Sequence, residues 1–328
     1  MDIQSLIGRV LLKDRRAIAQ AITIVENDSP QAARVLHELA PTLGNAYRLG
    51  ITGPPGAGKS TLTSEMTKAF LAQGKTVGII AIDPTSPFTG GALLGDRIRM
   101  QDVSMKDGVF VRSMATRGSL GGLSAKAKDA ADILDAAGFD VVIFETVGVG
   151  QSELDIAKAA DTTIVVLVPE SGDAVQAMKS GLMEIADFFV LNKSDREGAD
   201  QAVRAIKTIL TFRITHAEDE WIPDVVSTVA SKAKGIDEVL AEIERHKAHL
   251  GKTHSLTTRR IERERNRVIE LVESLLRIDF WSDKRKQELE EQLKAVAAHK
   301  ISSYSVAQEL VRKFRDNKNP QIKPQILR

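Results

Sequence analysis

The sequence predicts an α/β fold in which a doubly wound, mostly parallel sheet carries a phosphate-binding loop and is extended at both ends by helices. Two observations predict the sheet: short apolar or β-branched runs recur through residues 47–227, and helix-length segments separate most of them. Continuously apolar strands separated by helices are typical of a parallel sheet with both faces covered. The third observation is a glycine-rich pattern directly after the first run. The expected strands are 47–52, 76–82, 109–112, 140–144, 162–168, 187–191 and 223–227.

The first 45 residues are expected to form a helical arm. Apolar side chains recur at helical spacing from Ile3 to Leu11, which predicts a helix over 3–26. Asp28-Ser29-Pro30 has the pattern of a cap with proline in the first turn, so a second helix is expected to about residue 40. We predict three parts in all: a helical arm over 1–45, a phosphate-binding α/β domain over 46–250 and a C-terminal helical arm over 251–328.

The C-terminal arm differs from the rest of the chain in charge. Residues 251–328 carry 18 lysines and arginines against 11 acidic residues, whereas the first 250 residues carry 27 against 33. A hinge is expected near Gly251 to Ser255, followed by helices over about 256–278, 283–299 and 304–316, the last two capped by Ser282 and Ser303. The first of these helices repeats an apolar residue every seven positions, which favours pairing with a second copy over packing on its own domain.

Composition excludes several classes of protein. The 328 residues contain no cysteine, which excludes disulfides, zinc ribbons, iron–sulfur clusters and thiol catalysis. The formal net charge of +1 predicts no general attraction to nucleic acid or to a membrane. The N-terminus does not have the pattern of a signal peptide, and no apolar run approaches the ~20 residues that span a bilayer. We therefore expect a soluble cytoplasmic protein.

The strongest motif is a phosphate-binding loop that follows a strand and opens a helix. Its glycines let backbone N–H groups turn toward phosphate oxygens, and the helix N-terminus favours negative charge. The lysine is expected to reach the β- and γ-phosphates, and the serine hydroxyl to bind Mg²⁺. The nucleotide-binding residues predicted here are Gly53, Pro54, Pro55, Gly56, Ala57, Gly58, Lys59, Ser60 and the following Thr61.

A second motif, Asn192-Lys193-Ser194-Asp195, matches the guanine-reading pattern N-K-x-D. The Asp195 carboxylate can accept from the N1–H and 2-amino groups of guanine, and adenine offers no such pair of donors. Asn192 is expected to bond the base edge, and the Lys193 stem to cover the base. Far downstream of a phosphate-binding loop and at the end of a strand, the motif indicates GTP rather than ATP.

A third group of residues follows the strand at 140–144. Glu145 ends an apolar run and Gly148 stands three residues later, where a Mg²⁺-shell acid and a γ-phosphate N–H donor are expected. Glutamate is longer than the usual aspartate, so we expect it to act through water. The position after Gly148 is Val149, and the nearest glutamine is Gln151. We therefore predict slow intrinsic hydrolysis, with a missing group supplied by rearrangement or by a partner.

Three loops are candidates for switches. Asp83 ends a strand, and Asp96 lies in the polar, glycine-flanked loop that follows; their carboxylates are expected near Mg²⁺, although a solvated surface loop is the alternative. The glycine-rich segment 116–122 is less specific. After the strand at 162–168, Lys179 is expected to pair with a switch carboxylate or a phosphate, or to be a solvated helix charge. His246, His249 and His254 lack metal-ligand spacing and are expected in a solvated hinge region.

These motifs, in this order, resemble the MeaB/ArgK family of P-loop GTPases, which assist cobalamin-dependent acyl-CoA mutases. The segments that carry the likeness are GPPGAGKST, AIDPTSPFTGGALLGDRIRM, TRGSLGGL, ETVGVGQSE, PESGD with QAMKSG, and NKSD. The resemblance implies an N-terminal helical arm, a GTPase domain and a C-terminal dimerisation arm. It also implies a role in gating adenosylcobalamin loading and in protecting or reactivating methylmalonyl-CoA mutase or a relative.

The resemblance also implies roles for residues at matched positions. Lys59, Asp96, Glu145 and Lys179 would serve catalysis, and the metal shell would be Ser60, Asp83, Asp96 and Glu145. Relatives usually carry Ser-Ala in the base-capping loop, and Val229-Ala230 stands there in this chain. The prediction is a homodimeric, Mg²⁺-dependent GTPase that binds GTP and GDP and serves such a mutase. The alternatives are a nickel-insertion GTPase, which would need cysteine or clustered histidine ligands, and a P-loop kinase of a small molecule or protein, which would need an acceptor site and not the N-K-x-D motif.

Overall fold

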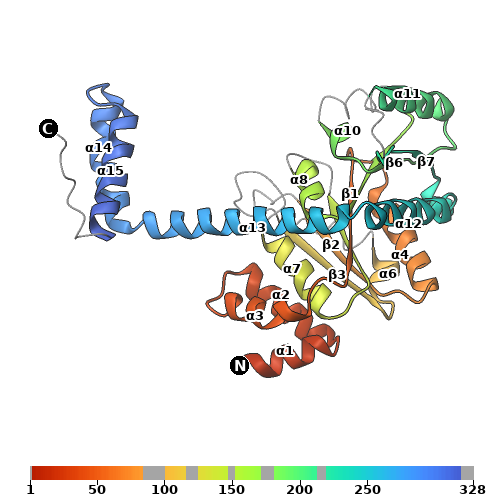
Figure 1. Ribbon diagram of the computed structural model, residues 1–328, viewed down its shortest axis with the longest axis horizontal. Coiled ribbons are helices and arrows are strands. Elements are labelled where there is room, and N and C mark those ends of the chain that lie inside the picture. Colours follow the sequence, from red (N-terminus) through yellow and green to blue (C-terminus); the bar gives the residue numbers. More distant parts are fainter. Residues whose placement is uncertain are drawn as a thin grey trace. The chain divides into compact units, whose positions relative to one another are not determined.

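The computed structural model describes residues 2–83, 100–115, 125–146, 152–170, 181–212 and 219–318. These divide by packing into two compact units, Met1–Ile261 and Glu262–Arg328. The first unit holds a seven-stranded sheet in the order β3-β2-β4-β1-β5-β6-β7, with every neighbouring pair parallel. The predicted fold class is therefore confirmed (Figure 1).

The seven strands agree with the expected ones to within a few residues at their ends. β1 lies between β4 and β5, and Ile51 near its end is in register with both Glu145 and Ile164. Because parallel strands end at the same edge, the loop after β1 and the acid at the end of β4 meet there. The bounds are β1 (Tyr47–Thr52), β2 (Val77–Asp83), β3 (Val109–Ala115), β4 (Val141–Thr146), β5 (Thr162–Leu167), β6 (Phe188–Leu191) and β7 (Val225–Ser227).

Helices cover both faces of this sheet (Figure 1). α4 (Lys59–Ala72), α6 (Gln101–Ser104) and α12 (Ile236–Lys252) share a core with one face, and α7 (Ala125–Ala136) and α8 (Ser152–Ala159) share a core with the other. In β2, Ile79 belongs to the first core and Ile80 to the second, as the two-residue period of a strand requires. A third core joins β5, β6 and β7 to α10 (Leu182–Ile185) and α11 (Ala199–Thr211).

The N-terminal arm packs into the first unit beside α7 (Figure 1). It forms three helices, α1 (Ile3–Leu11), α2 (Arg15–Glu26) and α3 (Ala32–Leu39), and a short 3₁₀ turn, η1 (Ala40–Thr42). The single helix predicted over 3–26 is wrong. Lys13 has a positive φ of 59°, and the Asp14 carboxylate accepts from the N–H groups of Arg16 and Ala17, so it caps a new helix.

The C-terminal helices lie close to their predicted positions. α13 (Ser255–Phe280) follows a two-residue break at Thr253 and His254, and α14 (Asp283–Ala297) and α15 (Ser303–Lys318) follow it. Ser282 caps α14 as predicted, whereas Ser302, one residue before the predicted cap, accepts from the Ser305 N–H at the start of α15. None of the helices in the described residues combines the length and the apolar character needed to cross a membrane.

The second unit buries little of the apolar surface of α13. Phe280 packs on Phe314 with ring centroids 5.3 Å apart, and Arg285 lies over the Phe314 ring, so α14 and α15 are held to the end of α13. The apolar side chains along the middle of α13 stay about half exposed or more: Val268, Ile269, Leu271, Val272, Leu275, Leu276 and Ile278.

Candidate functional site

The loop between β1 and α4 has the backbone that its glycines predict. Gly53 has φ +138°, and a Cβ there would lie 2.1 Å from the Val166 carbonyl oxygen of β5. Gly58 has φ +90°, and a Cβ there would lie 2.3 Å from Asn192 Nδ2. Side chains at either position would therefore force the loop away from its neighbours. α4 begins at Lys59, directly after Gly58, so its first N–H groups face the loop.

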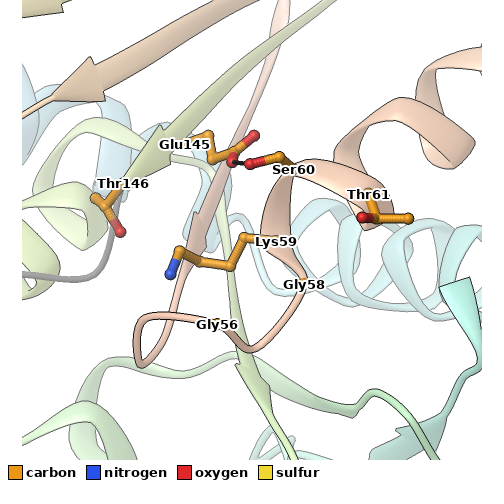
Figure 2. A pocket seen from close by; sticks show the side chains of 7 residues that line it. All are labelled: Gly56, Gly58, Lys59, Ser60, Thr61, Glu145 and Thr146. Atoms are coloured by element: carbon orange, nitrogen blue, oxygen red, sulfur yellow. Dashed lines mark hydrogen bonds between the residues drawn. The ribbon is translucent and has the colours of Figure 1, made fainter. Parts of the chain in front are cut away.

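A pocket of about 260 Å³ opens at this loop. Its lining includes Gly56, Gly58, Lys59, Ser60, Thr61, Glu145 and Thr146. Lys59 Nζ donates to the carbonyl oxygens of Gly53 at 2.7 Å and Pro54 at 3.0 Å. Figure 2 shows the Ser60 and Glu145 side chains pointing toward one another, and Ser60 Oγ donates to Glu145 Oε1 at 2.6 Å.

Two threonines at this edge were not predicted from the sequence. Thr146 Oγ1 donates to Thr52 Oγ1 at 3.1 Å, and both residues are fully buried. The bond joins the end of β4 to the end of β1, and so fixes Glu145 relative to the phosphate-binding loop. The sequence indicates these threonines only by their position, because Thr52 directly precedes Gly53 and Thr146 directly follows Glu145.

The N-K-S-D turn connects the phosphate-binding loop to the loop after β7. The Asn192 side chain is buried; its Nδ2 donates to Ala57 O at 2.8 Å, and its Oδ1 accepts from Ala230 N–H at 3.0 Å and Thr228 Oγ1 at 3.1 Å. Lys193 Nζ donates to Gly56 O at 2.7 Å. Asn192 is therefore a brace between two loops, which sequence reasoning had not foreseen.

The last residue of this turn carries the exposed carboxylate. Asp195 Oδ2 accepts from Lys232 Nζ at 2.9 Å, and this hydrogen bond holds the pKa of the carboxyl group below its usual value. Lys232 ends the short 3₁₀ helix η2 (Ala230–Lys232). The structure thus brings the phosphate-binding loop, Glu145 and the N-K-S-D turn together at the carboxyl ends of the strands.

The geometry agrees with a comparison of sequences. The profile of a family described as methylmalonyl-CoA mutase-associated GTPase MeaB matches residues 18–285, more than half of the chain. The chain belongs to the MeaB family. It is therefore a GTPase, because the family description and the names of similar relatives all give that activity.

Relatives of this MeaB-family chain are found in archaea, bacteria and animals. A Pyrococcus abyssi protein named as a GTPase is 48% identical over 313 residues, which are 95% of this chain and 97% of that protein. The GTPase ArgK of Escherichia coli is 40% identical over 71% of this chain and 72% of its own. The mouse protein named methylmalonic aciduria type A homolog, mitochondrial, is 35% identical over 70% of this chain and 59% of its own.

A solved structure shares the fold of this family member. The crystal structure of a LAO/AO transport system kinase is 29% identical, covers 95% of this chain and 97% of its own, and superposes with a TM-score of 0.73. The resemblance to the MeaB/ArgK family stated from the motifs is therefore confirmed.

Several predicted site residues lie outside the described residues. These are Asp96, Gly148 and Lys179, and the glycine-rich segment 116–122 also lies outside them. Asp83 ends β2, but its side chain is likewise outside the description. Val229 and Ala230, expected in the base-capping loop, are buried, and the Ala230 N–H donates to Asn192 Oδ1.

One prediction about the histidines is wrong. His246 was expected in a solvated region, yet it is fully buried at the opposite edge of the sheet, with Nδ1 2.8 Å from Thr162 Oγ1 and Nε2 3.2 Å from Asp187 Oδ1. Trp221 covers it, with ring centroids 4.6 Å apart. Because α12 packs on the sheet through this face, the histidine is a core residue rather than part of a hinge.

Proposed function

We propose that this GTPase is an accessory protein of an adenosylcobalamin-dependent acyl-CoA mutase such as methylmalonyl-CoA mutase. In this role it gates loading of the cofactor and protects or reactivates the mutase. The family description, which names association with methylmalonyl-CoA mutase, and the name of the mouse relative support the proposal. The main structural support for GTP binding and hydrolysis is that four residues lie at the same end of the sheet: Lys59, Ser60, Glu145 and Asp195.

The phosphates of GTP bind at the loop of residues 53–60. Backbone N–H groups of the loop and of the first turn of α4 donate to phosphate oxygens, with the helix dipole in support. Lys59, held on loop carbonyl oxygens, moves its ammonium onto the β- and γ-phosphates. Thr61, which lines the same pocket, completes the polar wall at the start of α4.

The residues of the pocket fit Mg²⁺. A hydroxyl oxygen of Ser60 and a carboxylate oxygen of Glu145 meet at 2.6 Å, and hard oxygen donors of this kind are what Mg²⁺ prefers. Ser60 would hold the ion directly and Glu145 through water, with Asp83 and Asp96 as further members of the shell. The ion would neutralise charge that develops on the phosphate oxygens during hydrolysis.

The base is recognised at the N-K-S-D turn. Asp195 accepts from the N1–H and 2-amino groups of guanine, and Lys193 covers the base while Asn192 holds the two loops together. Buried Val229 and Ala230 form the floor of the base loop. A P-loop kinase, the activity that the name of the similar crystal structure suggests, has no need of this turn.

Hydrolysis needs no covalent intermediate, because a positioned water attacks the γ-phosphate in line. A glutamine directly after Gly148 would orient that water, but Val149 stands there, so basal turnover is slow. Binding of the mutase acts through Asp96 and Lys179 and raises turnover. The protein acts as a cytoplasmic homodimer in which the exposed apolar side chains of α13 pair with those of a second copy.

Two experiments test this function. Competition of GTP and ATP for the purified protein measures guanine preference, which Asp195→Ala should abolish; unchanged preference in that variant would remove Asp195 from the base site. Gel filtration of the protein with the acyl-CoA mutase of the same organism, in GTP or in GDP, tests the partner. A nucleotide-dependent complex supports the proposal, and separate elution in both nucleotides contradicts it.

A further inference from the structure

The carboxylate proposed to read guanine is already engaged in an ion pair. Lys232 Nζ lies 2.9 Å from Asp195 Oδ2. The two residues stand on separate segments, the turn after β6 and the loop after β7, yet their backbones are held close. The Ser194 N–H donates to the Thr228 carbonyl at 2.9 Å, which fixes the turn against the loop.

The loop itself is closed in a way that presents Lys232 to the carboxylate. An antiparallel bridge joins Val229 to Lys234, and Ala233 between Lys232 and Lys234 takes a left-handed backbone with φ 51°. The bridge and the left-handed residue therefore orient the Lys232 side chain toward the Asp195 carboxylate. The ammonium nevertheless lies in solvent, with 68% of the lysine side chain and 44% of the aspartate exposed, so the pair can open without unfolding the loop.

Guanine and Lys232 would both donate hydrogen bonds to the oxygens of the Asp195 carboxylate. Reading guanine requires Asp195 to accept from both the N1–H and the 2-amino group, and Lys232 already donates to one of its two oxygens. Hypoxanthine keeps the N1–H of guanine but has no 2-amino group, so it needs one carboxylate oxygen only. A cation on the other oxygen therefore penalises guanine more than hypoxanthine.

We propose that Lys232 is a specificity-determining residue, whose ammonium competes with the guanine 2-amino group for Asp195. The protein then distinguishes guanine from hypoxanthine less sharply than the carboxylate would alone. This inference rests on the proposed reading of guanine by Asp195. An exposed pair of this kind changes an equilibrium by at most about fivefold, so Lys232 tunes the preference and does not create it.

The test is the ratio of the dissociation constants of IDP and GDP, measured by displacement of a fluorescent GDP analogue. Both ligands carry the same phosphates, so any effect of Lys232 on phosphate attraction cancels in the ratio. Lys232→Ala should raise the ratio about two- to fivefold. Lys234→Ala is the matched control, because it removes the same charge from an exposed position of the same loop and should leave the ratio unchanged.

Asp195→Ala separates failure of this inference from failure of the proposed base site. Both the base site and the competition by Lys232 are supported if the ratio of the IDP and GDP dissociation constants falls to about one in Asp195→Ala and rises in Lys232→Ala. A fall in Asp195→Ala with an unchanged or lower ratio in Lys232→Ala overturns the competition and keeps the base site. A ratio that Asp195→Ala leaves intact overturns the base site and the inference with it.

Discussion

Replacement of Arg260 by alanine should destabilise the first unit, because this arginine joins three segments at the edge of the sheet opposite the pocket. Its guanidinium donates to the Gly44 and Ala46 carbonyl oxygens at 2.7 and 3.0 Å, just before β1. It also donates to both oxygens of Asp161, at 2.8 and 3.2 Å. Asp161 is fully buried, and the Arg48 N–H also donates to it.

The size of the loss follows from this burial. Removing one partner of a buried ion pair costs about 3–5 kcal/mol. The Arg260 side chain is 24% exposed, so water can partly replace it, and we expect about 2–4 kcal/mol of lost unfolding free energy. For a unit of this size that corresponds to a fall of about 4–8 °C in Tm.

Thermal unfolding followed by circular dichroism measures this fall. The matched control is Lys158→Ala, which breaks an exposed pair with Asp155 on α8 and should change Tm by less than about 1 °C. Asp161→Asn removes the buried charge, so the double variant should be more stable than the sum of the single losses predicts. A change in Arg260→Ala no larger than in Lys158→Ala would refute the reasoning.

Three further predictions follow from other contacts. Gly58→Ala should weaken GDP binding at least about tenfold by isothermal titration, since its Cβ would collide with Asn192, whereas Gly74→Ala, also at positive φ but with nothing within 4 Å, should not. Glu145→Gln should lower kcat for GTP about 10–100-fold with little change in Tm, because the carboxylate that Ser60 contacts loses its charge. Turnover equal to that of the wild type would exclude Glu145 from the Mg²⁺ shell. Burial raises the pKa of Asp187, but His246, Arg259 and the Thr163 N–H lower it more, so the folded pKa lies below the ordinary 3.8. Its stabilisation is therefore complete above about pH 5 and lost as the pH falls through the folded pKa, and Asp187→Asn should flatten the acid side of a urea-midpoint profile; an unaltered profile would contradict this.

The sequence predicted the sheet well because its strands are buried on both faces and read as short apolar runs. It predicted the phosphate-binding loop for a local reason: Gly53, Gly56 and Gly58 all take a positive φ, which other residues rarely adopt. The helix break at Lys13 was missed because the apolar period continues across it, and a single capping aspartate decided the structure.

The opposite edge of the sheet was not predictable in the same way. His246 is read as solvated from its polar neighbours in sequence, but its surroundings come from Thr162, Asp187 and Trp221, which lie far away along the chain. Likewise, no local pattern indicates that Lys232 meets Asp195, because the contact depends on how two loops are tied together by Asn192.

The most direct test of the account is the GTP turnover rate of the purified protein, with and without an adenosylcobalamin-dependent acyl-CoA mutase from the same organism. Slow basal turnover that rises when the mutase is added is the predicted result. Equal turnover with and without the mutase would contradict the proposed partner while leaving the GTPase in place.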